Sequence, residues 1–307
     1  MNLITSSLAT AAAFLLSVLP IFGATPAAGE GGPRKLAVQL GAPFNDHAVL
    51  QRGMTVPVWG WSKPGTKVTV SFAGQNVSVT AGEDGKWVAE LKELKASFEP
   101  AELVISEEGG KTETLTNILV GEVWMASGQS NMQWFVGKSN VRELAKQLTE
   151  ETEGKVAPIR EFEVKSVTAQ LFPIEKATGD WRNGDYGGYS AVSLAFAHKL
   201  YKELNVPIGI LNCSWSSTPI QAWVPREGWA TAEDDYSKAI HQKCLISTPG
   251  TPEHKEAWDA FYKSLEAQIK ESEDLIKTKG EAKKIAVEVP GNMQGNRDAN
   301  WLFNGRM

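Results

Sequence analysis

The sequence predicts an α/β protein in which a small antiparallel β module precedes a domain built on a parallel sheet. Two observations lead to this fold class. Residues 36–118 contain short runs that alternate apolar and polar residues between turn signals, which is typical of an antiparallel sandwich. From residue 119 onward, continuous apolar runs alternate with segments of helical spacing, which indicates a parallel sheet with covering helices.

Glycine-rich turns separate the strands expected in the β module. Residues 56–61 predict a strand that ends at the turn Lys63-Pro64-Gly65, and further turns are expected at residues 73–76 and 83–85. The apolar positions of the other strands are Val68, Val70, Phe72, Val77, Val79, Leu103 and Ile105. The module carries no catalytic arrangement, so we expect it to be a structural or sugar-contacting accessory module.

The second part begins with residues 118–126, a continuous apolar run that predicts a strand buried on both faces. Ser190 is a candidate N-cap for a helix that ends at Asn205, and residues 206–211 then begin another buried strand. The apolar residues of this helix are Val192, Ala195, Phe196, Leu200, Tyr201 and Leu204. Residues 253–279 predict a second helix, whose many Lys and Glu residues form a solvated face.

Composition excludes several classes of protein. The 31 basic and 36 acidic residues give a net charge of −5, which argues against nucleic acid as a partner because phosphate binding needs a basic patch. Hydrophobic residues make up 42% of the chain, which is too many for a disordered protein. The 11 tryptophans suit stacking on sugar faces, with core packing as the alternative for most of them.

The N-terminus has the pattern of an export signal. The apolar stretch at residues 9–22 has the length of a signal-peptide core, and Ala24, Ala27 and Ala28 offer a cleavage site. Residues 1–28 therefore predict export to the periplasm, the cell surface or the medium. An uncleaved membrane anchor is the alternative, because no Lys or Arg precedes the run. Export permits a disulfide between Cys213 and Cys244, whose spacing predicts no metal site.

Ser130 is the candidate for covalent chemistry. It follows Gly128 by two residues, just after the expected strand at residues 118–126, and ligands bind at the carboxyl ends of parallel strands. A serine in such a turn exposes its hydroxyl, and its own N–H is placed to bind a developing oxyanion. Serine and glycine are also common in ordinary tight turns, so spacing alone leaves a structural serine as the alternative.

Residues 121–132, Gly-Glu-Val-Trp-Met-Ala-Ser-Gly-Gln-Ser-Asn-Met, resemble the signature block of the sialate O-acetylesterases. These belong to the SGNH hydrolases and remove acetyl groups from sugars. Further segments resemble the family in the same order, at residues 46–52, 57–61, 189–192, 206–211, 218–223 and 302–305. The resemblance implies a flavodoxin-like, three-layer hydrolase domain after a β-sandwich module, no metal or other cofactor, and an acetylated carbohydrate as substrate.

The resemblance also implies roles for individual residues. Ser130 attacks the acetyl carbonyl, and water then hydrolyses the acyl-enzyme. The backbone N–H groups of Ser130 and Ser217 bind the oxyanion, and Gln129, Asn131 and Trp223 contact the substrate. The family's W-G-G-T loop is here Trp215-Ser216-Ser217-Thr218. If this loop requires a positive φ, Ser217 carries a steric cost that glycine does not.

No residue matches the general base of the family. The family supplies it in an Asp-x-x-His segment late in the hydrolase domain, which none of His47, His198, His241 and His254 matches, and His198 is expected to face solvent. We therefore expect a C-terminally truncated esterase, in which residues 119–307 form the N-terminal part of the hydrolase domain and the chain alone is inactive. The alternative is a non-catalytic, exported glycan-binding protein with a decayed hydrolase domain.

Overall fold

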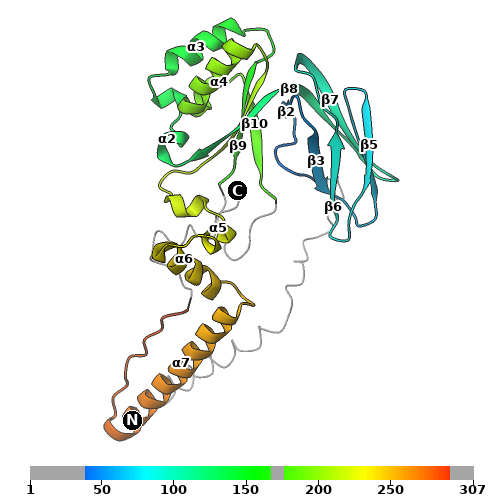
Figure 1. Ribbon diagram of the computed structural model, residues 1–307. Helices are drawn as coiled ribbons and strands as arrows, with labels where there is room; N and C mark the ends of the chain where they lie inside the picture. Colours follow the sequence, from blue (N-terminus) through cyan, green and yellow to red (C-terminus); the bar gives the residue numbers. More distant parts are fainter. Residues whose placement is uncertain (1–38, 167–175, 291–307) are drawn as a thin grey trace. The chain divides into compact units, whose positions relative to one another are not determined.

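The computed structural model describes residues 39–166 and 176–290. Its first part consists of strands, as Figure 1 shows. They are β1 (Gln39–Leu40), β2 (Val49–Gln51), β3 (Val56–Trp61), β4 (Lys67–Phe72), β5 (Gln75–Thr80), β6 (Lys86–Leu91), β7 (Ser97–Glu107) and β8 (Thr112–Gly128).

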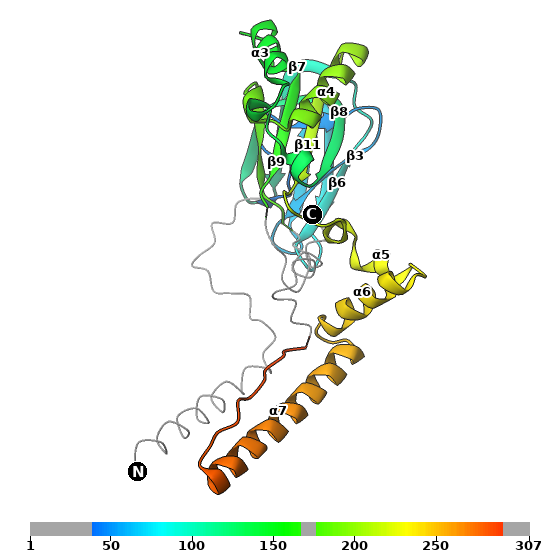
Figure 2. The same ribbon diagram turned by 90° about the vertical axis from the view of Figure 1, so that its left-hand side faces the viewer.

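The second part alternates helices and strands. The helices are α2 (Ser130–Gln133), α3 (Arg142–Glu151), α4 (Ala191–Leu204), α5 (Arg226–Ala230), α6 (Asp235–Ile246) and α7 (Pro252–Lys279). The strands are β9 (Ile159–Val164), β10 (Gly179–Asn183) and β11 (Ile208–Ser214). The second predicted helix is confirmed as α7, a long helix in Figure 2 that Thr251 caps by accepting a hydrogen bond from the His254 N–H at 3.1 Å.

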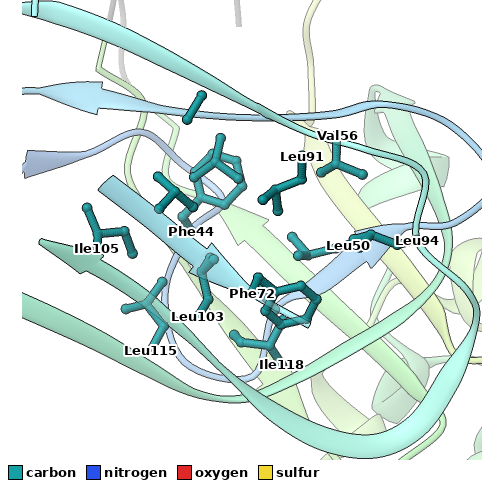
Figure 3. Packing of buried hydrophobic residues seen from close by; sticks show 14 of the residues in the cluster. Phe44, Leu50, Val56, Phe72, Leu91, Leu94, Leu103, Ile105, Leu115 and Ile118 are labelled. Carbon is teal, nitrogen blue, oxygen red and sulfur yellow. The ribbon is translucent and has the colours of Figure 1, made fainter. Parts of the chain in front are cut away.

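The predicted antiparallel module is confirmed. Strands β1, β3 and β6 form one antiparallel sheet, and β4, β5 and β7 join the first half of β8 in another. Alternate residues of both sheets enter one hydrophobic core, because successive side chains of a strand point to opposite faces. Figure 3 shows Val56 and Leu91 from the first sheet in the same cluster as Phe72, Leu103 and Ile118 from the second.

The predicted parallel strands are also present. β11 pairs in parallel with β8 on one side and with β9 on the other, and β10 adds an antiparallel edge. Helices α3 and α4 pack on one face of these strands through a cluster that includes Leu148 and Leu194. On the other face, Phe162 of β9 and Trp181 of β10 join the core of the β module. β8 runs through residue 118 without a break, so one strand serves both sheets.

A buried arginine links β9 to the β module. Arg160 is fully buried, and its guanidinium donates hydrogen bonds to the main-chain oxygens of His47 (2.8 Å) and Asn117 (2.6 Å). It also donates to Oδ1 of Asn117 at 2.8 Å. Burial lowers the pKa of Arg160 to about 10, so the side chain remains charged at neutral pH. His47 and Asn117, whose carbonyl oxygens both accept from this one cation, also both have positive φ.

The ends of α4 match the sequence prediction, and several of its apolar residues are exposed. Oγ of Ser190 accepts the Ser193 N–H at 3.2 Å, and Asn205 ends the helix in the left-handed conformation. Of the apolar residues that mark this helix in the sequence, Val192 and Phe196 are 49% and 42% exposed. The residues that α4 buries are Ala191, Ser193, Leu194 and Ala197.

The expected burial of residues 118–126 on both faces is wrong for the second half of the run. Ile118 to Val120 are buried, but Trp124 is 44% and Met125 is 67% exposed. At residues 119–121, β8 pairs with β2, and β7 pairs with β8 as far as Val120. Beyond Gly121, β11 is the single strand that pairs with β8 within the described ranges.

The predicted export signal and the last segment that resembles the family are not among the residues that the structure describes. Residues 1–28 and 302–305 lie outside the described ranges. Within those ranges, none of the helices combines the length and the apolar character that crossing a membrane requires. Cys213 and Cys244 are buried and are not bonded to each other.

Candidate active site

The loops that follow β8 and β11 lie next to each other. Gly128 and Ser214 are partners in the parallel register, and the Trp215 N–H donates to the Gly128 oxygen at 2.9 Å. Because parallel strands end at the same edge of a sheet, the residues after each strand share one site. Ser130, the first residue of α2, therefore lies beside the loop at residues 215–218.

Ser130 has two side-chain partners. Its Oγ donates to Oε1 of Gln129 at 2.7 Å and lies 3.0 Å from Oγ of Ser216. The Ser216 N–H in turn donates to Oε1 of Gln133 at 2.7 Å. These bonds connect both loops and fix the half-buried Ser130 hydroxyl between them. The Ser217 N–H was the group of this loop for which the resemblance implied a role, so the contact of the Ser216 hydroxyl was not predicted.

The predicted oxyanion donors differ in their surroundings. The Ser130 N–H donates to Oε1 of Gln129 at 3.0 Å, so the Gln129 side chain must rotate away before this N–H can bind a substrate oxygen. Gln129 and Asn131 are both exposed, which leaves them free to move. Ser217 has a φ of 64°, so this position does adopt the left-handed conformation that favours glycine.

Two tryptophans neighbour the candidate site. Trp223 contacts the loop at residues 215–218, and Trp134 follows Ser130 by four residues. Trp223 is half-buried, and its Nε1 donates to Oγ1 of Thr218 at 3.0 Å, so it braces the loop at residues 215–218. Trp134 is 54% exposed, and its Nε1 donates to the Lys138 oxygen at 2.8 Å. This bond satisfies the polar atom of Trp134 and leaves its ring available for stacking. Trp134 was not among the predicted site residues, although its place four residues after Ser130 was a usable signal.

Three histidines, His47, His198 and His254, have other partners or lie on other elements. Nδ1 of His47 lies 2.8 Å from Nδ2 of Asn117, and Nδ1 of His254 lies 2.8 Å from the Ile246 oxygen. His198 was expected to face solvent, but it is half-buried on α4, and burial, with a smaller effect of Lys202, lowers its pKa. Among the residues that the structure describes, the Ser130 hydroxyl bonds to Gln129 and Ser216, and neither side chain is a base.

A buried carboxylate lies on β9 near the start of α4. The side chain of Glu161 is fully buried and accepts the Ser190 N–H at 3.1 Å, with Nη1 of Arg182 3.7 Å away. Burial raises the pKa of Glu161 to about 7, although hydrogen bonds from Ser190 and Asn212 oppose the rise. Oδ1 of Asn212 also accepts the Ser214 hydroxyl at 2.6 Å, so polar groups continue from Glu161 to the end of β11.

Within residues 39–166 and 176–290, which the structure describes, there is no cluster of three or more His, Cys, Asp or Glu residues that could hold a metal ion. The chemistry that this arrangement supports is that of a serine hydroxyl between two loops that carry hydrogen-bond donors.

Comparison with known proteins identifies relatives of this region. The family model for carbohydrate esterase, sialic acid-specific acetylesterase, matches residues 120–248. The human sialate O-acetylesterase is 34% identical over 196 residues, which are 59% of this chain and 37% of the relative. The sialate O-acetylesterase of Pongo abelii is 28% identical over 247 residues, which are 72% of this chain and 45% of the relative.

A solved structure is also similar. A carbohydrate acetylesterase from Xanthomonas citri is 32% identical, with a TM-score of 0.57 over 62% of this chain and 43% of that one. The chain thus spans less than half of the length of each of these relatives.

Proposed function

Because the chain belongs, through residues 120–248, to the sialate O-acetylesterase family of carbohydrate esterases, we propose that Ser130 is the nucleophile of a serine carbohydrate O-acetylesterase. One observation carries this proposal. The Ser130 hydroxyl lies where two adjacent parallel strands end, beside the loop at residues 215–218. Its substrate would be an acetylated sugar, which fits the names of the relatives.

The proposed reaction has two steps. Oγ of Ser130 forms a bond to the acetyl carbonyl carbon as its proton passes to a general base, and the sugar hydroxyl then leaves with that proton. Water hydrolyses the acetyl-serine to acetate and regenerates Ser130. The N–H groups of Ser130 and Ser217 would bind the oxyanion in both steps, after Gln129 releases the Ser130 N–H. Gln129, Asn131 and Trp223 would contact the sugar.

The general base in this proposal comes from chain outside the described residues. A serine hydroxyl without a base is a weak nucleophile, and the two described partners of Oγ are an amide and a hydroxyl. We therefore propose that the 307-residue chain does not turn over acetyl esters alone. The remainder of the relatives' domain would supply the base.

Hydrolysis of 4-nitrophenyl acetate tests this proposal. Two proteins are compared: the 307-residue chain, and a fusion of the chain with the remainder of the Xanthomonas citri enzyme. We expect hydrolysis above background only from the fusion, and none from its Ser130→Ala variant. Full activity in that variant would rule out Ser130 as the nucleophile, whereas Ser130-dependent activity in the short chain would rule out an external base.

A non-catalytic glycan-binding protein is the second candidate. The exposed ring of Trp134 and the absence of a base next to Ser130 among the described residues favour it. This candidate predicts saturable binding of an acetylated glycoside to the 307-residue chain, with weaker binding by Trp134→Ala than by a Trp124→Ala control. Export remains part of both proposals, and N-terminal sequencing of the protein from its native host would test cleavage after residue 28.

A further inference from the structure

We propose that Glu161 is a positioning residue for Ser130. Through Ser190 and through Asn212, its buried carboxylate holds in place α2, which carries Ser130, and the loop at residues 215–218, which faces it. This role rests on the proposed function of Ser130 and deepens it, because Glu161 acts on the reaction only through its neighbours. Two chains of hydrogen bonds start at its carboxylate, and each ends at one part of the site.

Glu161 occupies a place in β9 where packing alone would favour an apolar side chain. In the register of the sheet it lies between Arg182 of β10 and Ile210 of β11, and its side chain is fully buried. A buried carboxylate loses its hydration, and an apolar residue of similar size in its place is often at least as stabilising. What distinguishes Glu161 is therefore the set of hydrogen bonds that its carboxylate accepts.

The first chain of hydrogen bonds runs from Glu161 to α2. Both carboxylate oxygens of Glu161 accept the Ser190 N–H, at 3.1 and 3.3 Å. The next N–H, that of Ala191, donates to the Trp134 oxygen directly after α2 at 2.8 Å. The Ser190 hydroxyl donates to Sδ of Met132, within α2, at 3.8 Å. The position of α2 therefore depends on a turn that Glu161 holds.

The second chain of hydrogen bonds runs from Glu161 to the loop after β11. The Asn212 side chain donates to the Glu161 carboxylate, and Oδ1 of Asn212 accepts both the N–H (3.1 Å) and the hydroxyl (2.6 Å) of Ser214. Asn212 and Ser214 are themselves buried, which keeps water from competing for these bonds. Ser214 ends β11, and two residues later the Ser216 hydroxyl lies 3.0 Å from that of Ser130.

The charge of Glu161 determines how well it serves both chains. Burial has the largest effect and raises its pKa to about 7, whereas the bonded donors and then Arg182 of β10 lower the pKa, and Glu163 of β9 raises it. Tyr189, just before α4, is also titratable, but burial raises its pKa and keeps it neutral. Protonation turns one oxygen of Glu161 from an acceptor into a donor, so it weakens at least one of the two chains.

An NMR titration tests this role without any turnover. The 307-residue chain is labelled with ¹⁵N-serine, and the N–H signals of Ser130, Ser190 and Ser216 are assigned by their loss in alanine variants. Spectra are recorded from about pH 4 to about pH 9. We expect the three signals to shift with one common midpoint, which Glu161→Gln abolishes. The exposed Glu150→Gln is the matched control and should keep the midpoint.

A further variant separates the two chains of hydrogen bonds. Asn212→Ala removes the second chain and leaves the bond between Glu161 and Ser190. The shift of the Ser216 N–H should shrink at least about twofold, whereas that of Ser190 should persist. An undiminished shift at Ser216 would show that it senses the charge of Glu161 through space, which would contradict a bonded route.

Amide exchange tests the same segments independently of titration. Glu161→Leu replaces the carboxylate by an apolar side chain of similar size. We expect the Val136 N–H, bonded to the Tyr189 oxygen, and the Trp215 N–H, bonded to the Gly128 oxygen, to exchange at least about tenfold faster. The Val70 N–H, on β4 in the β module, should keep its rate, and the control Glu150→Leu should leave all three rates unchanged.

Two further results would overturn the proposal. One is a midpoint at Ser190 without one at Ser130 and Ser216, which would make Glu161 a cap for α4 and nothing more. The other is unchanged exchange at Val136 and Trp215 in folded Glu161→Leu; if that variant does not fold, the titration with Glu161→Gln decides. These measurements need neither an ester nor a general base, so failure of the proposed chemistry is distinguishable from failure of the positioning role.

Discussion

The hydroxyl oxygen of Ser130 lies 3.0 Å from the hydroxyl oxygen of Ser216. This contact joins the loop after β8 to the loop after β11, at the end of the sheet where the proposed chemistry takes place. Ser216 stands in a loop that resembles W-G-G-T, so a glycine at this position would offer no hydroxyl. Ser130, the proposed nucleophile, therefore has a side-chain partner that neither glycine of the family pattern provides.

Ser216→Gly should increase the rate of ester hydrolysis by the fusion described above. The variant removes one neutral hydrogen bond from Oγ of Ser130, which is worth roughly 0.5–1.5 kcal/mol and corresponds to about a 2- to 10-fold change in rate. Steady-state kinetics with 4-nitrophenyl acetate would measure it, with Ser139→Gly, whose hydroxyl donates to the Val136 oxygen, as a control. A lower kcat in Ser216→Gly would instead show that Ser216 assists the nucleophile.

Ser217→Gly should stabilise the protein. Ser217 has a φ of 64°, and a left-handed non-glycine residue costs roughly 1–2 kcal/mol, part of which the greater flexibility of unfolded glycine offsets. We expect a net gain of about 0.5–1 kcal/mol in the free energy of unfolding, measured by urea denaturation. Ser217→Ala keeps the Cβ atom and should give no gain. Equal stability of the two variants would show that the main chain at residue 217 is not strained.

Glu161→Gln should remove a pH dependence of stability. The pKa of Glu161 is raised from 4.5 to about 7 in the folded protein, so the folded state binds more protons than the unfolded state between these values. Its contribution to stability is therefore complete below pH 4.5 and is lost as the pH rises through 7. The loss is on the order of 3 kcal/mol.

Urea denaturation at several pH values would measure this effect. We expect the free energy of unfolding of the parent protein to fall between pH 5 and pH 8 relative to that of Glu161→Gln. The exposed Glu150→Gln variant should follow the parent. If Glu161→Gln kept the full slope of the parent, another group would be responsible for it.

Arg160→Lys should destabilise the fold even though it preserves the charge. The guanidinium of Arg160 serves three acceptors on His47 and Asn117 at once, and a lysine ammonium has neither the reach nor the planar geometry to do so. A loss of roughly 2–4 kcal/mol is expected from buried acceptors left unpaired. Thermal unfolding would measure it, with the exposed Arg142→Lys as a control. A loss no larger than that of the control would mean that Arg160 does not hold β9 to the module.

Local patterns predicted much of the fold. Alternation in the β module, the Ser190 cap and the helix end at Asn205 all correspond to observed elements, because each depends on residues close in sequence. The exposure of Trp124 and Met125 was not predictable in the same way. An apolar run indicates a strand, but whether both edges of that strand are paired depends on segments distant in the sequence.

In the candidate site, too, local features were predicted from the sequence and contacts between distant segments were not. The place of Ser130 at the end of a strand followed from the apolar run before it. Its contact with Ser216, and the occupation of its N–H by Gln129, depend on side-chain conformations that a motif does not specify. The buried Arg160 and Glu161 also escaped sequence reasoning, because charged residues within a short strand resemble a solvated face until the packing around them is known.

The most direct test of the central claim is to trap the acyl-enzyme. The fusion protein is mixed with 4-nitrophenyl acetate, quenched in acid within the first turnover and digested for mass spectrometry. The account predicts a single acetylated peptide, with the acetyl group on Ser130, and no adduct in the Ser130→Ala variant. An acetyl group on Ser216 or Ser127 in the active protein, or hydrolysis with no acetylated serine at any time point, would contradict it.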